Sequence, residues 1–193
     1  MPLSLRQAVA IVASLNLLYF GVEFSVATTI ASVSLFADSI DFLEDASVNF
    51  LILAAFGWSA RNRARIGMLL AGILLIPGLA ALWTAAQKFT HFVAPSAVPL
   101  TLTGAGALAV NFFCAMLLAR FRHHGGSLTR AAFLSARNDV IANIAIITAG
   151  LITALTLSPW PDLVVGIGIA AMNADAAREV FAVAKREHAE AKP

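Results

Sequence analysis

Long apolar segments separated by short polar connectors run through nearly the whole chain. Six of these segments approach the ~20 residues that a helix needs to cross the hydrocarbon core of a bilayer. Backbone amides cannot be left without partners in lipid, so each segment is predicted to be helical. The predicted spans are residues 5–27, 32–59, 65–88, 98–121, 129–156 and 161–184. The pattern therefore predicts an all-α integral membrane protein, built as a six-helix transmembrane bundle.

Basic residues gather in alternate connectors, which predicts the orientation of the bundle. One set of connectors and both chain ends carry Arg6, Arg61, Arg63, Arg65, Arg120, Arg122, Arg130, Lys185, Arg186 and Lys192. The other connectors carry only Lys88. Because cytoplasmic loops are enriched in Lys and Arg, both termini are predicted to be cytoplasmic. We expect a multi-pass protein of a cytoplasmic (inner) membrane.

Composition narrows the function classes. Hydrophobic residues make up 60% of the chain and charged residues 12%, which is far more apolar than a soluble domain. Nearly every residue is assigned to a span or a short connector, so we expect a single membrane domain over residues 1–193, with lipid around it and no soluble C-terminal domain. The basic residues are spread among connectors and form no continuous patch, which argues against nucleic-acid binding.

The second predicted span contains an unusual group of acidic residues. Asp38, Asp41, Glu44 and Asp45 lie within it, and no Lys or Arg accompanies them. One ionised carboxylate at the centre of a bilayer costs at least ~2.5–3.5 kcal/mol. The group must therefore be neutralised by protons, by basic partners from elsewhere or by a bound cation.

The spacing of these acids suggests a cation site. At about 100° per residue, Asp38, Asp41 and Asp45 share one helical face. Asp41 and Asp45 are four residues apart, so both carboxylates can reach one point. Paired carboxylates are a common start of a divalent-cation site. The alternative is a carboxyl cluster that shares protons in purely structural hydrogen bonds.

The fifth predicted span supplies a complement. Asp139 is its one acid, with Ser135 a turn before it and Asn143 a turn after it. The predicted metal site consists of Asp41, Asp45 and Asp139, completed by Ser135, Asn143 or water, with oxygen ligands throughout. Arg137 is expected on the opposite face, where it either extends to the cytoplasmic surface or pairs with an acid such as Glu44.

The first predicted span carries a polar stripe. Asn16, Tyr19 and Glu23 lie on one face of it. The stripe fits either a path for protons or cations, or hydrogen bonds between helices. We expect Glu23 and Asp38 to contribute to a proton path or to support the metal site.

The acidic span and its neighbours resemble the cation diffusion facilitator family. The run SLFADSIDFLED at residues 34–45 is similar to the family's Leu-(Leu/Phe/Val)-Ala-Asp sequence followed by a His/Asp-x-x-x-Asp metal motif. The segment from Ser135 to Asp139 resembles the second such motif, with Ser in place of His or Asp. Trp160-Pro161-Asp162 resembles the start of the family's sixth helix. The similarity covers six helices, as in a short member without the usual cytoplasmic domain.

The resemblance implies both an activity and a ligand set. It implies that Asp41, Asp45 and Asp139 bind the transported metal, and that the protein is a homodimeric exporter exchanging a divalent metal for protons. Ser135 stands where the family motif has His or Asp. Without the imidazole that favours zinc, an all-oxygen site also suits harder ions. The expected substrate is Zn²⁺, Mn²⁺ or Fe²⁺, which is cargo and not a cofactor.

Two other functions remain compatible with the same acids. An uncoupled cation channel would use the same ligands without metal–proton exchange. A membrane metal sensor or assembly subunit would bind metal without moving it. An enzyme is not expected, because no nucleophile is paired with a base in the sequence.

Overall fold

The computed structural model describes residues 3–55, 83, 85–88, 93–121 and 126–172, without the side chains of residues 55 and 126–135. Its helices are α1 (Leu5–Ile30), α2 (Val33–Ala55), α4 (Ala97–Ala119), α5 (Gly126–Thr156) and a last helix over Trp160–Met172. The described part of the chain contains no strand. The fold is all-α, as predicted from the sequence.

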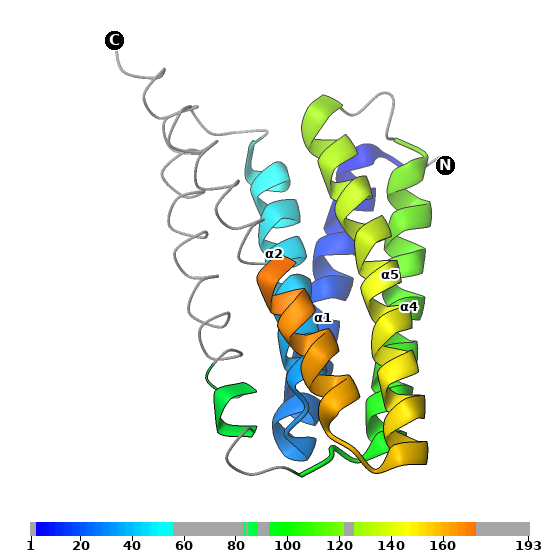
Figure 1. Cartoon of the computed structure of the whole chain (residues 1–193). Coiled ribbons are helices and arrows are strands. Elements are labelled where there is room, and N and C mark those ends of the chain that lie inside the picture. The colour runs from blue at the N-terminus through cyan, green and yellow to red at the C-terminus, as the bar shows by residue number, and fades with distance from the viewer. Residues whose placement is uncertain (1–2, 56–82, 84, 89–92, 122–125, 173–193) are drawn as a thin grey trace.

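Four of the helices form a ring around a shared interior (Figure 1). α1 packs against α2 and α4, and α5 packs against α2 and α4. Residues from α1, α2 and α5 therefore face one another although they are far apart in the sequence. The last helix, orange in Figure 1, packs Ile169 and Ala170 against the apolar cluster that contains Leu35 and Phe36 of α2.

Local sequence signals explain where α1 begins and ends. Ser4 caps its first turn by accepting a hydrogen bond from the Gln7 backbone N–H, and the Gln7 side chain accepts from the Ser4 N–H. This reciprocal capping box satisfies two of the amides that lack partners at a helix start. At the other end Ala31 adopts a left-handed conformation with φ of 52°. The chain reverses there, so α2 runs back alongside α1.

Small residues bring α4 and α5 close together. A Cβ on Gly104 would lie 2.9 Å from Cγ2 of Ile146, and one on Gly150 would overlap the Thr101 side chain. Glycine at these two positions lets the two backbones approach, as in many membrane helix pairs. The α4–α5 pair therefore forms one wall of the ring.

The surface composition agrees with a lipid environment. Large apolar side chains are exposed around the bundle, including Leu18, Phe112, Ile141 and Leu155. By length and composition, Leu5–Ile30, Ala97–Ala119 and Ala136–Thr156 are each able to cross a membrane. α2 differs from these three helices in carrying four acids within its length.

Four of the predicted spans correspond to described helices. The spans at residues 5–27, 32–59, 98–121 and 129–156 match α1, α2, α4 and α5. The span at residues 65–88 lies mostly outside the described residues, and the span at 161–184 is described only to Met172.

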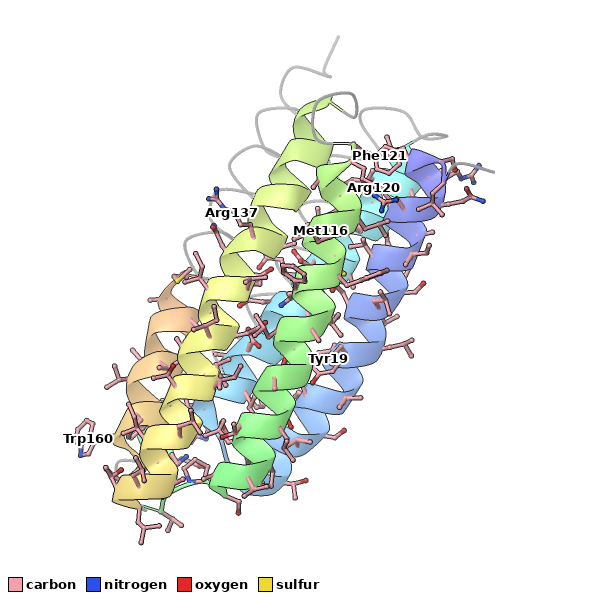
Figure 2. The ribbon with its side chains drawn as sticks, turned by 90° about the vertical axis from the view of Figure 1, so that its right-hand side faces the viewer. Tyr19, Met116, Arg120, Phe121, Arg137 and Trp160 are labelled. Carbon is pink, nitrogen blue, oxygen red and sulfur yellow. The ribbon has the colours of Figure 1, made fainter. Side chains whose placement is uncertain are left out.

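The positions of charged residues agree with the predicted arrangement. Arg120 and Arg137 lie toward the end of the bundle where α1 begins, whereas Trp160 lies at the opposite end (Figure 2). Arg137 is exposed, and its guanidinium donates to the neighbouring Asn138 at 3.4 Å. Among the described side chains it forms no ion pair with Glu44. Of the two alternatives for Arg137, extension to the surface matches the structure.

Candidate functional site

The acids of α2 face the interior of the helix ring at different depths. Asp38 is 0% exposed and Asp45 is 7% exposed. Asp41 and Glu44 are partly buried. The helical spacing predicted from the sequence therefore brings Asp38, Asp41 and Asp45 toward α1 and α5, into an environment where a lone negative charge is costly.

Asp38 is held by a chain of amide side chains. Its Oδ2 accepts a 2.6 Å hydrogen bond from Nδ2 of Asn143 on α5. The Oδ1 of Asn143 in turn accepts from Nδ2 of Asn111 on α4, at 3.0 Å. All three side chains are buried. This relay links three helices and fixes the orientation of the Asp38 carboxyl group.

Glu23 of α1 lies against Asp38. The two carboxyl groups are close enough to interact electrostatically. Glu23 is 0% exposed, and neither of its carboxyl oxygens has a donor among the described groups. Oδ1 of Asp38 also lacks a described donor. Two buried carboxyl groups in this geometry are stable only with a shared proton or a cation between them.

A second acid pair joins α2 to α5. The carboxyl groups of Asp45 and Asp139 lie near each other, close enough to interact electrostatically. Asp45 also accepts a 3.4 Å hydrogen bond from Nδ2 of Asn16 on α1. Asp41 also lies near the carboxyl group of Asp139. The predicted complement on α5 is therefore next to the predicted motif on α2.

Of the predicted ligands, the structure brings Asp45 and Asp139 together. No three His, Cys, Asp or Glu side chains among those described converge closely enough to hold a metal ion. The backbone of Ser135 lies in α5 one turn before Asp139, but its side chain lies outside the description. Asn143 is engaged by Asp38 and Asn111. The ligand set thus stays a prediction.

Tyr19 completes the polar stripe of α1. Its hydroxyl donates a 2.7 Å hydrogen bond to the backbone carbonyl of Thr103 on α4. The hydroxyl occupies the space that a Cβ on Gly106 would fill. Figure 2 shows Tyr19 on α1 beside α4. The stripe therefore makes two kinds of contact. Tyr19 and Asn16 form hydrogen bonds to other helices, whereas Glu23 lies against the carboxyl group of Asp38.

The sequence did not predict the polar cluster at the start of α2. Lys88 and Asp162 form a buried ion pair there, 2.8 Å between Nζ and Oδ2. The sequence did single out Lys88 as the one basic residue in its set of connectors, and Asp162 as part of the last helix start. Nothing in the spacing of two residues this far apart indicated that they pair.

Comparison with known proteins gives the family. The family model for the cation efflux transmembrane domain matches residues 9–187. The chain belongs to the cation efflux family. The match spans α1 through the last helix and includes every acid discussed above. No curated protein matches the chain.

Membership of the cation efflux family confirms several predictions. The protein is a multi-pass integral membrane protein and a metal cation efflux transporter, and it is not an enzyme. The resemblance seen in the SLFADSIDFLED run and in the segment from Ser135 to Asp139 is thereby confirmed at the level of the family.

Proposed function

We propose that this efflux protein exports a divalent metal, Zn²⁺, Mn²⁺ or Fe²⁺, from the cytoplasm in exchange for protons. The observation that carries the proposal is the packing of α2 against α5, which places Asp41 and Asp45 near Asp139. Carboxylates contributed by two facing helices neutralise a divalent ion and replace its water ligands with oxygen. The cytoplasmic (inner) membrane is the proposed location.

The proposed ligands are Asp41, Asp45 and Asp139. Ser135 or a water completes the set. Asn143 is a poorer candidate for the fourth ligand in this conformation, because its amide already joins Asn111 to Asp38.

Proton exchange follows from the chemistry of the same carboxyl groups. Without metal, buried acids this close together retain protons, because ionising both members of a pair places two negative charges side by side. A metal ligand must be deprotonated, so metal binding releases protons and proton uptake releases metal. The interior of the bundle thus holds protons or metal in alternation.

The Glu23–Asp38 pair is proposed as the proton path. It lies on the side of the acid group nearer the start of α2, where the chain emerges at the Trp160 end of the bundle. The free carboxyl oxygens of Glu23 accept a proton without breaking any described hydrogen bond. Protons entering there reach Asp41 one turn further along α2.

Proton release on metal binding tests the proposal directly. Adding Zn²⁺ or Mn²⁺ to lightly buffered, detergent-solubilised protein should acidify the solution in proportion to the metal bound. The Asp45→Ala variant should bind little metal and release few protons. Metal binding without proton release would favour the uncoupled channel. Binding and proton release without flux in vesicles would favour a sensor or subunit.

Homodimerisation is a separate expectation, which light scattering of the solubilised protein measures.

A further inference from the structure

A buried ion pair lies where α1 ends and α2 begins. The side chains of Lys88 and Asp162 are 6% and 0% exposed, with Nζ 2.8 Å from Oδ2. Asp162 belongs to the last helix, whose first residue, Trp160, marks this end of the bundle in Figure 2. A buried ion pair is stable only when the remaining hydrogen-bonding capacity of both groups is met.

Asp162 meets this condition completely. Its Oδ1 accepts 2.6 Å hydrogen bonds from the hydroxyls of Ser32 and Ser34 and a 3.1 Å bond from the Ser34 N–H. Its Oδ2 accepts from the Val33 N–H at 2.9 Å as well as from Lys88. A carboxylate has about four lone-pair sites, so every site of Asp162 is engaged.

These bonds cap the start of α2. The first four N–H groups of a helix have no partner within it. Those of Val33 and Ser34 are satisfied by Asp162, whereas that of Leu35 donates to the Ser32 hydroxyl at 3.2 Å. The N–H of the N-cap residue Ser32 donates to the Ala27 carbonyl at 3.0 Å, and Phe36 makes the first i→i−4 bond of the helix, to the Ser32 carbonyl at 3.3 Å. The acidic helix is therefore anchored by a residue about 130 positions further along the chain.

The two charges also complement two helix ends. Lys88 Nζ donates a 2.6 Å hydrogen bond to the carbonyl of Ala31, the C-cap residue of α1. A helix C-terminus carries partial negative charge and an N-terminus partial positive charge. The ammonium thus faces the end of α1, and the Asp162 carboxylate faces the start of α2. Each charge stabilises a helix end as well as its partner.

Close backbone contact reinforces the anchor one turn further along the last helix. A Cβ on Gly166 would lie 2.6 Å from the carbonyl carbon of Val33 and 2.7 Å from the amide nitrogen of Ser34. The last helix and the start of α2 are therefore in direct backbone contact. Sliding or rotation of α2 at this point would break hydrogen bonds and create overlaps at the same time.

We propose that Asp162, held in place by Lys88, is a positioning residue for the metal site. It fixes the height and rotation of α2, and thereby the position of Asp41 and Asp45 opposite Asp139. Asp41 lies only about two turns from the capped end, so a shift there is transmitted to its carboxylate. The inference rests on the proposed function, because it concerns the affinity of that site for metal.

The test measures metal affinity and not only transport. Binding of Zn²⁺ and of Mn²⁺ to the purified full chain in detergent is measured by titration calorimetry, alongside thermal unfolding. The main variant is Ser32→Ala/Ser34→Ala, which removes two donors to Asp162 and leaves both charges in place. The matched control is Thr28→Ala/Thr29→Ala, which removes two exposed hydroxyls that donate to carbonyls of their own helix.

The serine variant is expected to weaken metal binding about tenfold, as loss of a group that orients metal ligands commonly does. The control should keep the wild-type dissociation constant. A second variant, Lys88→Met/Asp162→Asn, removes both charges together, so that no lone charge stays buried. It should also bind metal about tenfold more weakly.

The outcomes separate this inference from the proposed function. The inference is wrong if the folded fractions of Ser32→Ala/Ser34→Ala and Lys88→Met/Asp162→Asn both bind metal as tightly as the wild type. Asp162 would then stabilise the fold without positioning the site. Unchanged affinity with lost transport would identify the cluster as a gate and would equally overturn it. If the wild type binds neither of these ions, nor Fe²⁺, the proposed function itself fails.

Discussion

The side-chain amide of Asn143 donates a 2.6 Å hydrogen bond to Asp38, which joins the middle of α5 to the acidic helix α2. Asn143 also accepts from Asn111 on α4. One buried carboxamide therefore holds three helices in register. Its position one turn beyond Asp139 places this junction next to the proposed metal ligands.

Removing the Asn143 carboxamide should destabilise the bundle. Asn143→Leu leaves Nδ2 of Asn111 and Oδ2 of Asp38 without partners, and each unsatisfied buried group costs about 1–3 kcal/mol. The melting temperature in detergent should fall clearly, and Thr148→Ala, which removes an exposed hydroxyl bonded to its own helix, should leave it unchanged.

A double variant checks that the effect comes from the relay. In Asn111→Leu/Asn143→Leu the loss of stability should be smaller than the sum of the two single losses, because both substitutions remove the same hydrogen bond. Additive losses would mean that the two amides act independently.

Loss of either member of the α2–α5 acid pair should abolish transport. Asp45→Ala and Asp139→Ala each remove a proposed ligand, so metal flux into proteoliposomes should fall to background while the protein still inserts. Ser25→Ala, which alters an exposed hydroxyl on α1, is the control. Wild-type flux in either acid variant would contradict the site assignment.

Restoring an imidazole should change the choice of metal. Ser135→His places a nitrogen ligand one turn before Asp139, and zinc prefers nitrogen more strongly than manganese does. The ratio of Zn²⁺ to Mn²⁺ flux should rise in competition experiments. An unaltered selectivity order would show that residue 135 does not contact the ion.

Two glycines of the last helix should respond in opposite ways to the same substitution. A Cβ on Gly166 would collide with the backbone at Val33 and Ser34, whereas one on Gly168 would meet no atom within 4 Å. Overpacking of this kind costs about 1–3 kcal/mol. Gly166→Ala should therefore lower the melting temperature in detergent.

Gly168→Ala is the matched control, because it makes the same chemical change two residues away. Alanine favours a helix over glycine by about 0.5–1 kcal/mol, so this variant should be as stable as the wild type or more stable. Equal destabilisation by both substitutions would contradict the close contact between the last helix and α2.

Much of the fold follows from the sequence because membrane helices are specified locally. The apolar lengths of α1, α4 and α5 are read directly from the chain. The face shared by Asp38, Asp41 and Asp45 follows from helical periodicity alone. The sequence also predicted that Asp45 and Asp139 belong to one site, since each is an acid in an otherwise apolar span.

Contacts between segments that are distant in the sequence were harder to predict. Asn111 is an ordinary polar residue of an apolar span until α5 brings Asn143 to it. Lys88 and Asp162 have no periodic relationship, and their pairing depends on where the last helix meets the α1–α2 turn. Such bonds are set by tertiary packing, which the hydrophobic pattern of a single helix does not encode.

In the proposed transport cycle, buried carboxyl groups exchange protons for metal. The most direct measurement is uptake of Zn²⁺, Mn²⁺ and Fe²⁺ by proteoliposomes under an imposed pH gradient, with Asp45→Ala as control. Protonated carboxylates release metal, so acid on the side of metal release should accelerate flux, and alkalinisation there should slow it. Gradient-dependent flux that disappears in Asp45→Ala is the predicted result. Flux of equal rate with and without the gradient would contradict the exchange mechanism.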